Sequence, residues 1–160
     1  MNVRRTLATL LAAAVLAPLT ACNAQSKSEG LFMKKSVVLD LVMYSYWDRP
    51  ISDVYLNRVD IGLANSYGGS GIITSVVIPL GPQTLTWRLG GPRGTPRNGE
   101  TVGIKNSLVL NADQIPANAR YIGVHIYPDS TAEFTFSKYM PDTTPRGDEL
   151  IAKGRAGRGE

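Results

Sequence analysis

The sequence is poor in the residues that most often carry catalysis, since its 160 residues include one cysteine and one histidine. A single cysteine cannot form a disulfide within the chain, so the fold must be stabilised by packing alone. With one histidine, a zinc site would need carboxylates for its other ligands, and the acidic residues show no spacing that suggests one. We therefore expect no metal site and no cofactor.

Charge of either sign is also sparse. The chain has 17 Lys and Arg against 13 Asp and Glu, and two of the basic residues, Arg4 and Arg5, lie in the first 21 residues. The rest of the chain is therefore close to neutral, with both signs interspersed. Nucleic-acid binding calls for a basic patch or stripe, so we expect no nucleic-acid partner.

An export signal is predicted at the N-terminus. Residues 7–17 are uncharged and mostly apolar, and they follow the basic pair Arg4 and Arg5. The hydrocarbon core of a bilayer is about 30 Å thick and needs about 20 apolar residues, so this run is too short to span it. A basic start, a short apolar helix and an exit through small residues are typical of a secretory signal peptide.

Residues 19–22 (Leu-Thr-Ala-Cys) follow the apolar run and resemble the lipobox of bacterial lipoproteins. The resemblance implies that residues 1–21 are removed as a signal peptide and that Cys22 becomes the lipidated N-terminus. Asn23, in place of Asp, implies the outer membrane, with the domain facing the periplasm. The alternative is an ordinary soluble signal peptide that is cut near Ala24.

The rest of the chain shows the two-residue period of β-strands and no convincing helical period. We expect a flexible polar tether over residues 22–35 and one folded domain over residues 36–140. Strands are predicted at residues 37–44, 54–59, 72–80, 84–89, 101–110, 121–127 and 132–138, and the last two are expected to form a hairpin through residues 128–130. About seven short strands in about 100 residues predict an all-β fold, a single antiparallel β-sandwich of the immunoglobulin-like type.

Three stretches carry more specific expectations. Residues 72–80 are almost continuously apolar, which is typical of a central strand buried on both faces, and the glycines of residues 67–71 permit tight turns before it. Residues 90–99 contain four Gly and two Pro, which predicts a long exposed loop. Residues 141–160 are rich in Pro, Gly, Arg and Asp, and are predicted to form a disordered tail.

His125, as the only histidine, is the first candidate for catalysis. On a strand over residues 121–127, Ile122, Val124 and Ile126 point toward the core, which places His125 on the outer face. An isolated imidazole has no partner to tune it, so His125 is either a surface residue or part of a partner-binding surface. No Gly-x-Ser-x-Gly elbow follows a predicted strand, and we expect that the chain is not an enzyme.

Aromatic and arginine residues favour a binding surface instead. Trp, Tyr and Arg are the residues that most often anchor protein interfaces. The predicted binding residues are Tyr46, Trp47, Arg49, Arg93 and His125. The alternative is that the two tryptophans belong to the core, and Trp87 shares one strand face with Leu85 and Leu89, which favours that interpretation for it.

Residues 44–51 (Tyr-Ser-Tyr-Trp-Asp-Arg-Pro-Ile), followed by residues 54–57 (Val-Tyr-Leu-Asn), resemble the opening of an uncharacterised family of proteobacterial lipoproteins. Residues 67–71, 84–87 and 124–129 are similar to later parts of its pattern, so the resemblance covers about residues 37–139. The sequence departs from the pattern at Ser45, Trp47 and Arg58, and it lacks the internal cysteines that many members carry.

The resemblance implies a role in immunity. Members often look like immunity proteins encoded beside type VI secretion lipase effectors. The implied partners are the membrane, through the N-terminal lipid, and a secreted phospholipase, whose active site or membrane docking the lipoprotein would block. The alternative is an envelope structural or assembly lipoprotein that binds other cell-envelope components.

Overall fold

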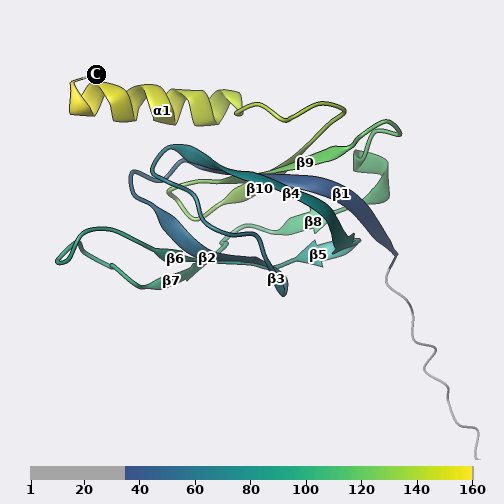
Figure 1. The fold of residues 1–160 in the computed structure, drawn as a ribbon, viewed down its shortest axis with the longest axis horizontal. Coiled ribbons are helices and arrows are strands. Elements are labelled where there is room, and N and C mark those ends of the chain that lie inside the picture. Colours follow the sequence, from purple (N-terminus) through teal and green to yellow (C-terminus); the bar gives the residue numbers. More distant parts are fainter. Residues whose placement is uncertain (1–34, 160) are drawn as a thin grey trace, which may run out of the picture. The chain divides into compact units, whose positions relative to one another are not determined.

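The computed structural model describes residues 35–159, which are mostly β-strand with one α-helix (Figure 1). The expected all-β class is confirmed. The predicted signal peptide, Cys22 and all but the last residue of the predicted tether lie outside the described residues. The elements are β1 (Ser36–Ser45), β2 (Ile51–Leu56), β3 (Val59–Asp60), β4 (Gly68–Pro79), β5 (Gly81–Gln83), β6 (Leu85–Leu89), β7 (Thr101–Gly103), β8 (Leu108–Leu110), the 3-10 helix η1 (Ala112–Gln114), β9 (Tyr121–Ile126), β10 (Ala132–Ser137) and α1 (Pro145–Arg158).

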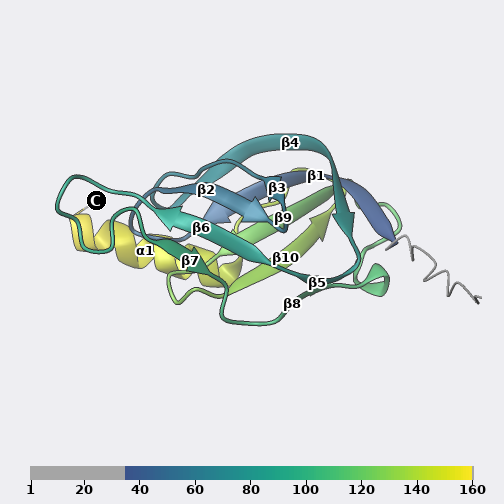
Figure 2. The same cartoon turned by 90° about the horizontal axis from the view of Figure 1, so that it is seen from below.

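The strands of residues 35–159 form three sheets (Figure 2), with the orders β10-β9-β1-β4, β3-β2-β6-β7 and β5-β8. The predicted hairpin of β9 and β10 is confirmed, with Ala132 opposite Ile126. The expectation of a wholly antiparallel fold is wrong at one pair, because β1 runs parallel to β9 from Asp40 opposite Tyr121 to Ser45 opposite Ile126. The two strands are distant in the sequence, so no turn signal could predict their direction.

One hydrophobic core joins the sheets. It contains Leu41 of β1, Val54 of β2, Trp87 of β6 and Val124 of β9, all fully buried. Trp87 meets the ring of Trp47 edge-on, with 6.3 Å between the ring centroids. Both tryptophans are therefore core residues, as the alternative interpretation of the sequence proposed.

The apolar segment at residues 72–80 is not a central strand. It lies largely in β4, at the edge of its sheet beside β1, where Ile72 is 44% and Val77 56% exposed. The glycines before it begin this strand, and a turn lies directly ahead of them, where the Gly68 N–H donates to the Asn65 carbonyl at 3.1 Å. An added Cβ on Gly69 would come within 3.2 Å of the Met43 carbonyl oxygen. β-branched residues fit a pleated strand whether or not it is buried, so composition alone could not place this strand in the sheet.

The prediction of a disordered tail over residues 141–160 is also wrong, because residues 145–158 form α1. The sequence carries the signals that begin and end a helix. The Thr144 side chain accepts a hydrogen bond from the Gly147 N–H at 3.1 Å, and Pro145 occupies the first turn. Gly159 adopts the left-handed conformation that ends helices. These local signals outweighed the Gly- and Arg-rich composition.

Glycines set how closely α1 approaches the sheet of β10, β9, β1 and β4 (Figure 1). A Cβ on Gly147 would overlap the buried ring of Tyr46, and one on Gly154 would overlap the ring of Tyr67. Gly157, on the same helix, has open space around its Cα. No helix within residues 35–159 is both long and apolar enough to cross a bilayer.

We predict that Gly147→Ala lowers the free energy of unfolding by about 1–3 kcal/mol, because the methyl group forces α1 away from Tyr46. The control Gly157→Ala has room for its methyl group and should stabilise the helix by up to about 1 kcal/mol through higher helix propensity. Urea unfolding, with limited proteolysis of α1, measures both effects. Equal free energies of unfolding for the two variants would contradict the close packing of the helix.

Candidate functional site

The five predicted binding residues do not form one exposed surface. Tyr46 and Trp47 are buried, with 1% and 7% of their surfaces exposed, and His125 is fully buried. Arg49 is partly covered, and its Nη1 donates to the Pro96 carbonyl at 2.7 Å, which ties the segment before β2 to the loop of residues 90–99. Arg93 is exposed in that loop, whose predicted exposure is confirmed. Cys22 lies outside the described residues.

The predicted face of His125 is confirmed, but its predicted exposure is wrong. Ile122, Val124 and Ile126 are buried in the core, and His125 points to the opposite face of β9. The chain after Met140 covers that face, which removes the imidazole from solvent. We use the name tyrosine–histidine cluster for the side chains on this face, Tyr44, Tyr46, His125 and Tyr127. Their alternation in the sequence was the available signal that this face is covered, because such a large aromatic face is seldom exposed to water.

Both ring nitrogens of His125 have partners. Its Nδ1 lies 2.9 Å from the Tyr46 hydroxyl, and its Nε2 lies 2.9 Å from Thr135 Oγ1. The Tyr46 hydroxyl accepts the Thr144 N–H at 3.1 Å, so we assign its own proton to Nδ1, which leaves Nε2 as the donor to Thr135. Tyr44 stacks on the imidazole with 5.1 Å between ring centroids. The only histidine is thus part of a buried hydrogen-bond network.

Tyr127, also in the tyrosine–histidine cluster, holds the C-terminal segment in place. The Tyr127 hydroxyl lies 2.6 Å from Thr144 Oγ1 and also donates to the Glu133 carboxylate. The Arg146 guanidinium lies 3.8 Å from the centroid of the Tyr127 ring, and it pairs with Asp129 at 2.7 Å. Burial raises the pKa of both Tyr46 and Tyr127, which keeps these phenols protonated as hydrogen-bond donors.

Burial also lowers the pKa of His125 to about 4, against a smaller opposing effect of the Glu133 carboxylate. Between about pH 4 and pH 6.5, the folded protein therefore holds a neutral imidazole where an unfolded chain would hold a mostly protonated one. A solvent-shielded ring with both nitrogens engaged is suited to fixing β9, β10 and the C-terminal segment together. Within residues 35–159, no group of three or more His, Cys, Asp or Glu side chains could hold a metal ion.

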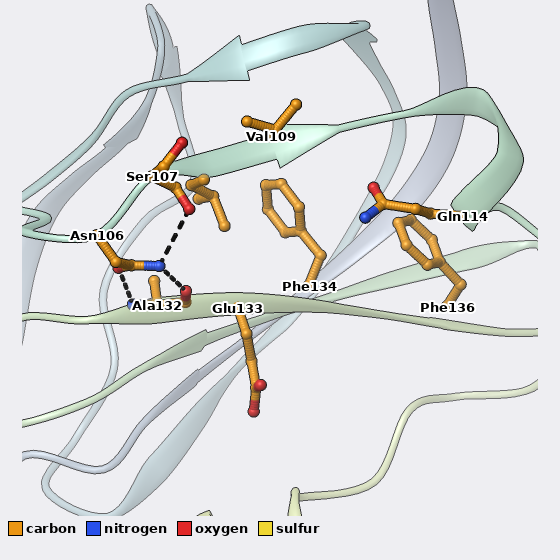
Figure 3. Close-up of a pocket in the computed structure, with 9 residues that line it drawn as sticks. Asn106, Ser107, Val109, Gln114, Ala132, Glu133, Phe134 and Phe136 are labelled. Atoms are coloured by element: carbon orange, nitrogen blue, oxygen red, sulfur yellow. Dashed lines mark hydrogen bonds between the residues drawn. The ribbon is translucent and has the colours of Figure 1, made fainter.

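A groove of about 530 Å³ lies between β8 and β10 and is here called the β8/β10 groove (Figure 3). The rings of Phe134 and Phe136, both half-buried, project from β10 toward Val109 and Gln114 on the other side. β8 pairs only with β5 and β10 only with β9 among the described strands. The groove therefore separates two sheet edges, and no pattern in the sequence predicts it.

One end of the groove is closed by an asparagine. The side-chain amide of Asn106 donates to the Ala132 carbonyl and accepts the Ala132 N–H, both at 2.9 Å. Next to it, the Lys105 N–H donates to the Ser130 carbonyl at 2.8 Å. Asn106 thus pairs with Ala132 as a neighbouring strand would, and the two edges diverge beyond that point.

We predict that stability falls between pH 7 and pH 4.5 because of His125. Its folded pKa lies below its unfolded pKa, so the unfolded chain binds a proton that the folded chain does not, and this shift costs about 2 kcal/mol over that range. Urea unfolding of the wild type and of His125→Gln at both pH values tests this. The variant should lose clearly less stability on acidification, and an equal loss would show that the imidazole is not shielded.

Comparison with known proteins assigns this chain to no group. No family model matches the sequence, and no match was found among curated proteins or among solved structures. The function is therefore proposed from the residues, their geometry and the resemblance described for residues 37–139.

Proposed function

We propose that the chain is a lipid-anchored binding module of the bacterial envelope, attached through Cys22 to the outer membrane and facing the periplasm. The lipobox-like residues 19–22 support the anchor, and the fold begins at Ser36, a short polar segment beyond it. The proposed architecture of the module is an immunoglobulin-like β-sandwich. Its support is that strands of the two four-stranded sheets contribute to one core.

The observation that carries a binding role is the β8/β10 groove. It combines two aromatic side chains with the edge of a regular strand, which are features that recognise polypeptides. The most obvious catalytic candidate, His125, is committed instead to hydrogen bonds inside the fold. We therefore propose a binding protein and not an enzyme.

The specific partner that we propose is a secreted phospholipase effector. The support is the resemblance of residues 37–139 to the lipoprotein family often found beside type VI secretion lipases. The mechanism would be steric, since a module bound to the lipase blocks its active site or its docking on lipid. The anchor would hold the module at the membrane where the substrate lies, which raises its effective concentration there.

We expect Cys22→Ser to prevent lipidation and release the protein from the membrane fraction. Metabolic labelling with a radioactive fatty acid and fractionation of the envelope measure both effects. The control is Ser26→Ala, in the same segment, which should remain labelled and membrane-bound. Labelling of Cys22→Ser equal to that of the wild type would contradict the anchor.

The immunity role predicts that cells lacking this gene are killed by sibling cells that secrete the cognate lipase, and that the wild-type gene restores survival. Cys22→Ser should restore survival less well than Ser26→Ala at equal protein level, because it loses the local concentration at the membrane. Survival in competition assays, together with binding of the purified lipase, is the measurement. No binding to any lipase encoded beside the gene would contradict immunity and favour the envelope structural or assembly role.

A further inference from the structure

We propose that the β8/β10 groove is a strand-addition site, which binds a short extended segment of a partner polypeptide along the free edge of β10. The inference rests on the proposed binding function and names the surface and the chemistry of its partner. In this recognition mode, main-chain hydrogen bonds supply affinity, and alternate side chains supply specificity.

The free edge of β10 differs from the other sheet edges of residues 35–159. β3 has two residues and β7 has three, while β5 and β8 have three each and β5 contains Pro82. β4 is long, but its pairing with β1 is interrupted by two register shifts. Short strands, prolines and irregularities are the usual protection of edges against added strands. β10 has six residues in unbroken register with β9, and it contains neither proline nor lysine.

The backbone of β10 has unpaired groups on the groove side. The carbonyls of Thr131 and Ser137 accept hydrogen bonds from the N–H groups of Tyr127 and Arg120, toward β9. The groups of Ala132 point the other way, toward Asn106. Because backbone direction alternates along a strand, Phe134 and Phe136 direct their N–H and C=O groups into the groove, as Ala132 does.

Asn106 indicates which kind of ligand suits this edge. Its planar amide occupies the position of a peptide group opposite Ala132, and it supplies one donor and one acceptor in strand-like geometry. A partner strand would continue this pairing over Phe134 and Phe136. The site is therefore short, because Asn106 ends it on one side and Gln114 lies beside Phe136 at the other.

The side chains around the edge define the sequence of the segment. Phe134 and Phe136 pack on the core side of β10, so the partner residues on that side must be apolar. On the outer side, Glu133 and Thr135 already bond to Tyr127 and His125, so the partner residue there faces a polar surface. The expected ligand is an extended peptide with apolar side chains at two alternate positions and a polar residue between them.

A second copy of this chain fits the groove less well than a single extended segment. β8 lies across the groove from β10, so an approaching β10 edge would bring its own β8 with it. A free segment carries no such neighbour. The expected partner therefore presents a loop or terminus, and not the edge of a folded sheet.

The test uses the protein purified in detergent and a synthetic peptide of about six residues, similar in length to β10, that alternates valine with threonine. Two control peptides contain the same residues. In one the valines are adjacent, and in the other the backbone amides are N-methylated. We expect the alternating peptide alone to bind and to slow hydrogen exchange at the amides of Phe134 and Phe136. No slowing at millimolar peptide, or equal slowing by the N-methylated peptide, would overturn the proposal.

Two substitutions test whether the peptide binds in the β8/β10 groove. Phe136→Lys places a charge in the groove and should weaken peptide binding roughly tenfold or more. Its matched control, Val77→Lys, places the same charge on the exposed edge strand β4 and should bind normally. Thermal unfolding checks that both variants fold, and if Phe136→Lys does not fold, Phe136→Thr replaces it. If a folded variant at position 136 binds the peptide with unchanged affinity, the proposed site is wrong. If the variant binds the lipase as the wild type does, the proposed function still stands.

Discussion

The hydrogen bonds of His125 are the interaction on which the arrangement of this domain depends. The imidazole contacts Tyr46 after β1 and Thr135 on β10, and Tyr46 in turn binds the backbone of Thr144, where α1 begins. A single neutral side chain thus links three segments that are far apart in the sequence. Gly123 leaves the space for this link, since a Cβ there would come within 2.8 Å of the imidazole Nε2.

The same network explains why only one side of β10 is open to a partner. Its outer face is occupied by the tyrosine–histidine cluster and the C-terminal segment, and its inner face packs partly on the core. Only the edge of β10 remains open. Its position is fixed by pairing with β9 and by the hydrogen bonds of Glu133 to Tyr127 and of Thr135 to His125. A rigid edge loses little entropy when a strand is added to it, which favours binding.

The sequence allowed good predictions where the signal was local. The β9–β10 hairpin, the exposed loop of residues 90–99 and the core position of Trp87 follow from alternation and turn residues. Features that depend on distant pairing could not be predicted, namely the parallel β1–β9 pair and the edge position of β4. The helix α1 lies between these cases, because Thr144 and Pro145 were readable signals that the composition of the tail concealed.

The proposed binding of a partner depends on the addition of a strand to β10. The most direct measurement is the set of nuclear Overhauser contacts between a bound extended peptide and the protein. Strand addition predicts contacts from the peptide backbone protons to those of Phe134 and Phe136, in the pattern of neighbouring strands. Contacts confined to β4, to the loop of residues 90–99 or to α1 would contradict it.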